Sequence, residues 1–152
     1  MKAIFIILSV FFLISCSKND DSQEQFVIDL GASFSIQNAA GDDLLDPNNP
    51  NAFKQSDIKT YHLINGEVKL AGADDMLFLG NNGLYVFGTF VNYEGNDEFP
   101  ITYIDWSETD RDTIKSEIYR TENQIRAIKV WYNDTLMWDV ENGDAPYFTI
   151  VK

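Results

Sequence analysis

IKTYHLINGEVKL, residues 58–70, carries the clearest local pattern in this chain of 152 residues. Asn65-Gly66 supplies two residues that tolerate positive φ, which a type I′ turn requires between two strands. Apolar and polar side chains alternate around the turn, as they do in strands with one buried face. The stretch therefore predicts a tight β-hairpin that pairs Ile58–Ile64 with Glu67–Leu70.

Similar short strand patterns, separated by turn residues, occur on both sides of this hairpin. Strands are predicted at Phe26–Leu30, Ala32–Gln37, Met76–Leu79, Leu84–Tyr93, Ile101–Trp106, Ile125–Tyr132, Thr135–Val140 and Tyr147–Val151. Thr113–Tyr119 fits either a helix or a strand; we predict a strand, because turn-rich segments surround it. Gly88 predicts a bulge inside its strand. The expected fold is all-β, an antiparallel β-sandwich of about eight short strands with immunoglobulin-like or transthyretin-like packing.

The beginning of the chain has the pattern of a targeting segment. Ile4–Ile14 is apolar apart from Ser9, follows Lys2, and is shorter than the about 20 apolar residues of a spanning helix. We therefore predict a signal peptide over residues 1–15. Cys16 is the single cysteine, and one thiol in an exported chain is unusual unless it is used chemically. Ordinary signal cleavage and a retained membrane anchor are the alternatives.

Leu13-Ile14-Ser15-Cys16 resembles the bacterial lipobox, in which the cysteine is diacylated and the chain is cut before it. The resemblance implies that Cys16 is lipidated and that its acyl chains hold the mature protein in a membrane. Residues 16–25 are polar throughout, so we expect the lipidated cysteine to begin a flexible acidic tether. This tether resembles the export signal of Bacteroidota lipoproteins, which implies an outer-membrane protein exposed at the cell surface. A solvated linker without a targeting role is the alternative.

Three further segments extend the resemblance: Phe34-Ser35-Ile36-Gln37-Asn38, GDDLLD at residues 41–46, and Lys129-Val130-Trp131-Tyr132-Asn133. Together with the lipobox and the tether, they look similar to small uncharacterised lipoproteins of Bacteroidota. This resemblance extends over most of the chain and implies no particular activity. We expect one monomeric domain, residues 26–152, behind the anchor.

The charge of the chain excludes one class of partner. It has 24 acidic and 11 basic residues, for a formal net charge of −13. Such a protein repels nucleic acid and anionic lipid surfaces, so we expect no nucleic-acid partner. With one cysteine there is no internal disulfide, and stability must come from packing of the many aromatic side chains.

One loop concentrates oxygen ligands. Asp42, Asp43 and Asp46, with nearby asparagines, offer the donors that Ca²⁺ prefers. Their spacing differs from that of an EF-hand, and Asp and Asn are also the common turn residues, so a capped loop is the alternative. His62 is the single histidine, which leaves neither a zinc ligand set nor an independent indication of a Ser-His-Asp triad. We expect no cofactor.

An exposed aromatic group is expected on one face of the sheet. Alternation along Ile125–Tyr132 separates an inward set, Ile128, Val130 and Tyr132, from an outward set, Ala127, Lys129 and Trp131. Tyr119 should lie outward on a neighbouring strand, with Tyr103 close by. Such aromatic residues stack on sugar rings or anchor a protein partner. Alternatively, they pack against a loop or the edge of the core.

These patterns predict a lipid-anchored, non-enzymatic accessory or binding domain at the bacterial outer membrane, which engages a protein or a glycan through a sheet face or loops. The alternatives are a small hydrolase that acts on polysaccharide or peptide through a carboxylate pair, and a purely structural envelope protein. With 24 acidic residues some carboxylate pair is inevitable, so its presence would not by itself indicate a glycosidase.

Overall fold

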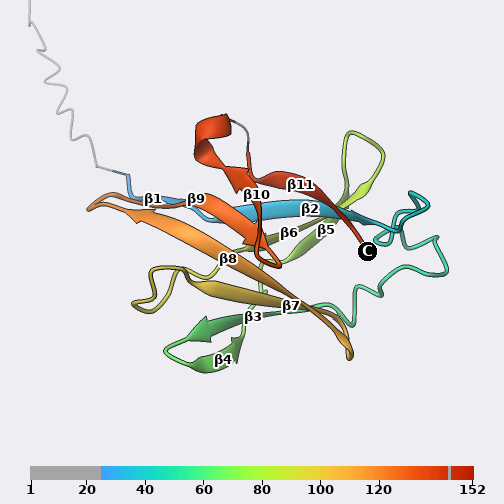
Figure 1. Cartoon of the computed structure of the whole chain (residues 1–152), viewed down its shortest axis with the longest axis horizontal. Coiled ribbons are helices and arrows are strands. Elements are labelled where there is room, and N and C mark those ends of the chain that lie inside the picture. The colour runs from blue at the N-terminus through green and yellow to red at the C-terminus, as the bar shows by residue number, and fades with distance from the viewer. Residues whose placement is uncertain (1–24, 144) are drawn as a thin grey trace, which may run out of the picture.

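The structure, a computed structural model, describes residues 25–143 and 145–152. The predicted signal peptide, Cys16 and the tether up to Glu24 lie outside the described residues. Within them the chain forms eleven strands and one short 3₁₀ helix, η1 (Val140–Asn142). The prediction of an all-β sandwich is confirmed (Figure 1). No helix in the described part of the chain is long and apolar enough to cross a membrane.

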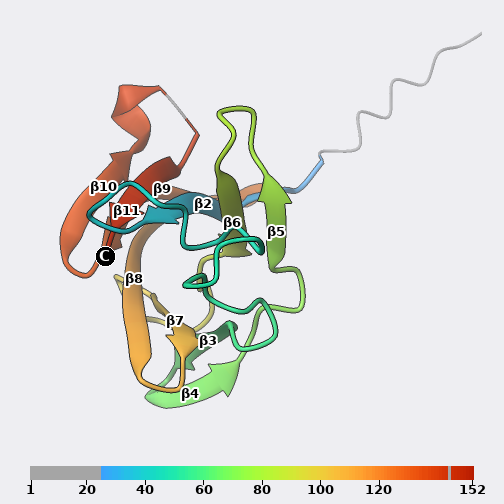
Figure 2. The ribbon, with the colours of Figure 1, turned by 90° about the vertical axis from the view of Figure 1, so that its right-hand side faces the viewer.

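The strands form two facing sheets, which Figure 2 shows from one end of the molecule. Sheet A has the order β1 (Val27–Asp29), β9 (Gln124–Tyr132), β8 (Asp110–Arg120), β7 (Ile101–Ser107), β3 (Lys59–Ile64) and β4 (Glu67–Leu70), and β10 (Thr135–Asp139) also pairs with β9. Sheet B has the order β11 (Tyr147–Val151), β2 (Gly31–Gln37), β6 (Tyr85–Phe90) and β5 (Met76–Leu79). Two pairs run parallel, β1 with β9 and β11 with β2, and the other pairs are antiparallel.

One extended segment belongs to both sheets. β1 pairs in sheet A and β2 pairs in sheet B, with only Leu30 between them. Leu30 is buried, and its carbonyl accepts a hydrogen bond from Val91 N at 2.9 Å. Because the chain changes sheets over one residue, the two sheets are held together at this end.

Aromatic rings fill the space between the sheets. Phe34 of β2 lies 5.7 Å from Phe87, 5.8 Å from Trp106, 5.8 Å from Tyr132 and 5.5 Å from Phe148, measured between ring centroids. These residues come from both sheets, and all five are buried. Tilted and edge-on ring pairs at these distances are favourable packing geometries. The sandwich is therefore stabilised by aromatic packing, as the composition predicts.

Two local predictions are confirmed. The hairpin of β3 and β4 turns at Asn65 and Gly66, whose φ angles are 53° and 83°. The ambiguous segment Thr113–Tyr119 lies within β8, so it is a strand.

Two predictions about strand regularity are wrong. β6 pairs through Gly88 with β2 and β5 in unbroken register, so there is no bulge there; a Cβ at Gly88 would lie 3.8 Å from the Phe78 ring, which packs across this position. The register shifts lie in other ladders: β9 with β10, β7 with β8, and β8 with β9, where the register skips Ile128. Such a bulge reverses the alternation, so Ala127 is buried with Val130 rather than facing outward.

Candidate binding groove

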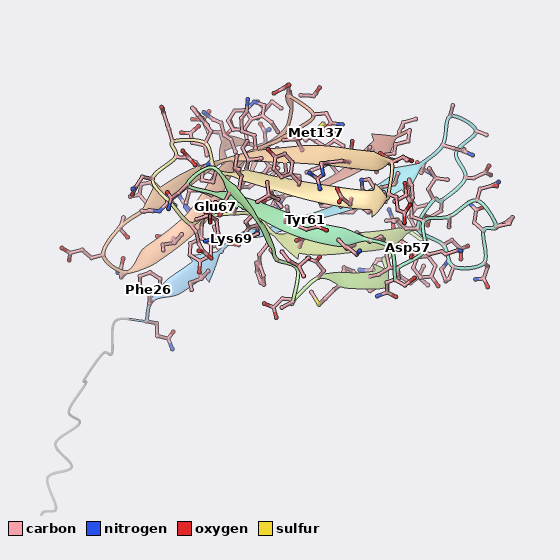
Figure 3. The ribbon with its side chains drawn as sticks, turned by 90° about the horizontal axis from the view of Figure 1, so that it is seen from below. Phe26, Asp57, Tyr61, Glu67, Lys69 and Met137 are labelled. Atoms are coloured by element: carbon pink, nitrogen blue, oxygen red, sulfur yellow. The ribbon has the colours of Figure 1, made fainter. Side chains whose placement is uncertain are left out.

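A groove lies between the two sheets and is lined by residues of β3, β4 and β6 and of the segment 71–75. Its volume is about 640 Å³, which is within the range of small-ligand sites. Its apolar lining consists of Ile28, Leu30, Ile64, Leu70, Phe90 and Tyr93. In Figure 3, Glu67 and Lys69 mark β4, and Phe26 lies at the end of the molecule opposite Asp57. We call this feature the edge groove.

The edge groove exists because β5 is short. The ladder between β5 and β6 ends at the Met76–Gly88 pair, whereas β6 continues to Phe90. Before β5, the chain crosses from sheet A to sheet B through Gly72, whose φ is 81°. A Cβ on Gly72 would meet the Asp75 carboxylate, so any other residue at this wall of the groove would have to displace that side chain.

Large apolar side chains of the groove are open to solvent. Ile28 is 57% exposed, Leu70 71% and Phe90 46%, whereas the floor residues Leu30 and Thr89 are buried. Isolated exposed apolar residues are common on protein surfaces, but several around one concavity indicate a surface that binds another apolar group.

The polar groups of the groove are mostly acidic. Asp74, Asp75 and Glu94 contribute to its lining, and the one lysine there, Lys69, has its Nζ 3.8 Å from a Glu67 carboxylate oxygen. Thr60 Oγ1 donates a hydrogen bond to Asp75 Oδ2 at 2.5 Å. The other oxygen, Asp75 Oδ1, is buried without a donor among the described residues. A ligand with a donor or a positive charge beside its apolar part would match these groups.

The wall that follows β6 is held in place by Asn92, whose side chain is buried. Its amide Nδ2 donates to Leu63 O at 2.8 Å and to Ile101 O at 3.2 Å, and its backbone N donates to Thr102 Oγ1 at 2.7 Å. Arg120 also donates a hydrogen bond to Tyr93 O. Because these contacts come from within the chain, the groove is formed without a ligand.

The predicted aromatic residues Trp131 and Tyr119 do not form one patch. Lys115 pairs in register with Trp131, whereas Tyr119 lies four residues further along β8, about 13 Å away. The Trp131 ring packs edge-on against Phe99 at 5.8 Å, and Lys115 Nζ lies 5.2 Å from its centroid. Tyr119 is exposed, with the guanidinium carbon of Arg126 5.5 Å from its ring centroid.

Tyr103 is also separate from Trp131 and Tyr119. It pairs with Tyr61 across β7 and β3, and the Arg111 guanidinium carbon lies 5.2 Å from its ring centroid and 5.3 Å from that of Tyr61. Arg111 in turn forms a two-pronged ion pair with Asp105, at 2.5 and 2.9 Å. The outward face of sheet A therefore carries aromatic rings that are each paired with a cation of the same chain.

The carboxylates of the proposed calcium loop accept local hydrogen bonds. Asp43 accepts from the backbone N of Tyr85 at 2.7 Å and from the backbone N two residues after itself at 2.8 Å. Asp46 accepts from the backbone N of Asn48 at 2.9 Å, and Asp42 from an asparagine amide at 2.8 Å. In the described ranges, no group of three or more His, Cys, Asp or Glu side chains is placed to hold a metal ion. The arrangement is that of a capped loop.

A second polar cluster lies at the opposite edge of the sandwich, around the buried Asp112. Its carboxylate accepts hydrogen bonds from Trp106 Nε1 at 2.7 Å, Asn133 Nδ2 at 2.6 Å and the Tyr132 hydroxyl, and Lys152 Nζ lies 2.5 Å away. Burial disfavours the charged carboxylate, but Lys152 and the other donors outweigh it and hold the pKa of Asp112 below its ordinary value. Burial and the bond to Asp112 raise the pKa of Tyr132.

This cluster links the two sheets. Lys152 also contacts Asp110 Oδ1 at 2.6 Å, and its ammonium lies 5.4 Å from the Phe53 ring centroid and 5.6 Å from that of Trp106. Because Lys152 follows β11 of sheet B and Asp112 belongs to β8 of sheet A, the ion pair joins the two sheets.

The sequence reasoning missed the edge groove. Val68 and Leu70 of β4 are exposed although they are apolar. The alternation of apolar and polar residues along β4 therefore did not show which side chains face solvent. His62, considered above as a zinc ligand and as a catalytic residue, lines the groove, with Nε2 3.3 Å from Phe90 O. Comparison with known proteins gives no matching family model, no matching curated protein and no matching solved structure.

Proposed function

We propose that this chain is a lipid-anchored, non-enzymatic binding domain of the bacterial outer membrane, and that its edge groove holds an apolar segment of a partner protein. The observation that carries the proposal is the exposure of Ile28, Leu70 and Phe90 around a preformed concavity of about 640 Å³. The resemblance of Leu13–Cys16 to a lipobox and of the tether to a surface-export signal supports the location.

The lining favours a protein partner over a glycan. Ile28, Ile64 and Leu70 are aliphatic and offer no hydrogen bonds to hydroxyl groups. Trp131, which was expected to stack on a sugar ring, lies outside the groove on sheet A, packed against Phe99 and Lys115. An apolar peptide segment would remove exposed hydrophobic area from water on both sides, which drives association.

The anchor would keep the groove near the membrane. If Cys16 carries the acyl chains, residues 16–25 span at most about 35 Å, since an extended residue covers about 3.3–3.6 Å. The tether meets the domain at Phe26, two residues before Ile28 of the groove. A partner in the same membrane would therefore be within reach.

The location is tested by adding protease to intact cells and following the mature protein, with Cys16→Ala as the control. Degradation in intact cells, together with release of the control from the membrane, is expected. Protection until the outer membrane is broken would contradict surface exposure.

The groove is tested with an apolar fluorescent probe and the purified chain. We expect saturable binding that the Phe90→Asp variant loses, because the charge lies in the apolar lining while the backbone pairing of β6 is unchanged. The matched control is Leu136→Asp on β10, which alters a similarly exposed residue outside the groove. Equal binding by both variants would contradict the groove assignment.

A further inference from the structure

β5 is an edge strand that lacks most of the usual protection against pairing. Its four residues, Met76 to Leu79, are all apolar, and Met76 is 60% exposed, Phe78 44% and Leu79 60%. Edge strands of soluble proteins are usually protected by short length, charges, prolines or bulges, and of these β5 has only its short length. β4, which ends sheet A, follows that rule with Glu67 and Lys69, whereas β5 has no charge and no break in its register with β6.

The free side of β5 presents a defined set of backbone groups. Gly80 N donates to Leu84 O at 2.8 Å, which makes these two residues a hydrogen-bonded pair. Hydrogen-bonded and non-hydrogen-bonded pairs alternate along an antiparallel ladder. The N–H and C=O groups of Phe78 therefore point toward β6, and those of Leu77 and Leu79 point to the open edge. Within residues 25–143 and 145–152, no other strand pairs with this edge.

We propose that β5 pairs with β5 of a second copy of this chain, antiparallel about a two-fold axis at Phe78. In this register Leu77 of each copy lies opposite Leu79 of the other, so the open N–H and C=O groups of both leucines are used. Phe78 lies opposite its own equivalent, and cross-strand aromatic pairs stabilise sheets. The interface is self-complementary, as a two-fold dimer requires, and sheet B continues from one copy to the other.

The distribution of charge is compatible with this register. A net charge of −13 disfavours self-association, but charges further apart than about 8 Å are largely screened at physiological salt. The acids nearest β5 are Asp74 and Asp75. The two-fold register brings this end of one strand beside the Asn81-Asn82 turn of the other, so carboxylates face amides instead of other carboxylates. The dimer differs from the monomer expected from the sequence, and it places this turn beside Asp74 and Asp75 at the rim of the edge groove.

Disulfide trapping in the full chain tests the register. At a non-hydrogen-bonded antiparallel pair the Cα atoms are about 4.5 Å apart, which suits a disulfide. Phe78→Cys should therefore give a disulfide-linked dimer on non-reducing gels. Met76→Cys is the matched control on the same strand: it is more exposed, but the register separates the two copies of residue 76 by four residues, or about 13 Å. Wild-type chain, in which Cys16 is the one cysteine, gives the background.

A dimer from Phe78→Cys at least about tenfold above that from Met76→Cys supports the proposal. Equal trapping at both positions, trapping at neither, or adducts of Phe78→Cys with another protein would overturn it. Sedimentation gives a second measurement that needs no cysteine: the wild-type chain should have the mass of a dimer, and Phe78→Lys that of a monomer. A wild-type chain that is monomeric at all concentrations up to about 100 µM, which corresponds to a binding free energy weaker than about −5.5 kcal/mol, would also overturn the proposal.

Discussion

The Lys152→Met variant should be less stable than the wild-type chain at pH 7 by about 2–3 kcal/mol. Lys152 Nζ lies 2.5 Å from Asp112 Oδ2, and the two side chains are only 18% and 7% exposed. Removing one partner of a buried ion pair costs about 3–5 kcal/mol, because a charge stays buried without its counter-ion. We expect a cost at or below the low end of this range, since Trp106 and Asn133 still donate hydrogen bonds to the carboxylate.

The effect should depend on pH in a defined direction. The pKa of Asp112 in the folded protein is below the ordinary value of 3.8, so its stabilising contribution is complete above that value and is lost as the pH falls through the lowered pKa. In the variant the pKa of Asp112 rises, because the hydrogen bond and charge of Lys152 are gone. The stability difference between the two proteins should therefore be largest near pH 7 and shrink below about pH 4.

Urea unfolding followed by tryptophan fluorescence measures both effects. With an m-value of about 2 kcal/mol/M, the midpoint of Lys152→Met should fall by about 1–1.5 M at pH 7. The control is Lys69→Met, which removes an exposed lysine 3.8 Å from Glu67 and should change stability by less than about 0.5 kcal/mol. If Lys152→Met matches this control, or if its effect is the same at pH 7 and pH 3, the account of the cluster is wrong.

Three other substitutions test separate parts of the structure. Gly72→Ala should cost about 1–3 kcal/mol more than Gly66→Ala in urea unfolding, because both residues have positive φ but only at position 72 does the added Cβ meet another atom. Asn92→Ala should lower the free energy of unfolding by about 2–3 kcal/mol, measured in the same way, since two partly buried carbonyls lose the amide of a buried side chain as donor. Trp131→Ala should cost about 1–2 kcal/mol for its partly buried ring and leave binding of the apolar probe unchanged; loss of probe binding by a folded variant would contradict the groove assignment.

Features determined by neighbouring residues could be predicted from the sequence. Asn65-Gly66 specifies its turn by backbone conformation alone, and the hairpin forms where it was expected. The strand assignment of Thr113–Tyr119 was also correct, although Ile114 and Ile118 fit a helix as well. The β-propensity of the segment and its all-β surroundings both favour a strand.

Features that depend on distant residues could not be predicted. The bulge at Ile128 depends on how β9 pairs with β8. Alternation along β9 alone, which predicted that Ala127 faces outward, could not reveal it. The parallel pairing of β11 with β2 joins Phe148 to Phe34 across most of the chain. Lys152 lies far in sequence from the carboxylates that hold it.

The edge groove was missed for the same reason. It is the space left where β5 ends at Met76 while β6 continues to Phe90, and strand lengths are the least certain part of a pattern. Conversely, Trp131 and Tyr119 were expected to form a patch because both face outward. Alternation gives the face of a residue but not its position along the neighbouring strand, and here that offset separates them.

Photo-crosslinking in living cells tests the role of the edge groove most directly. A photoreactive amino acid replaces Leu70, the most exposed apolar residue of the groove, and in a second strain it replaces Leu136 on β10 as the control. We predict a discrete adduct with one envelope protein from position 70, no such adduct from position 136, and loss of the adduct when Phe90→Asp is added. Identical adducts from both positions, or an adduct from position 70 that persists with Phe90→Asp, would contradict the proposal that the groove holds the partner.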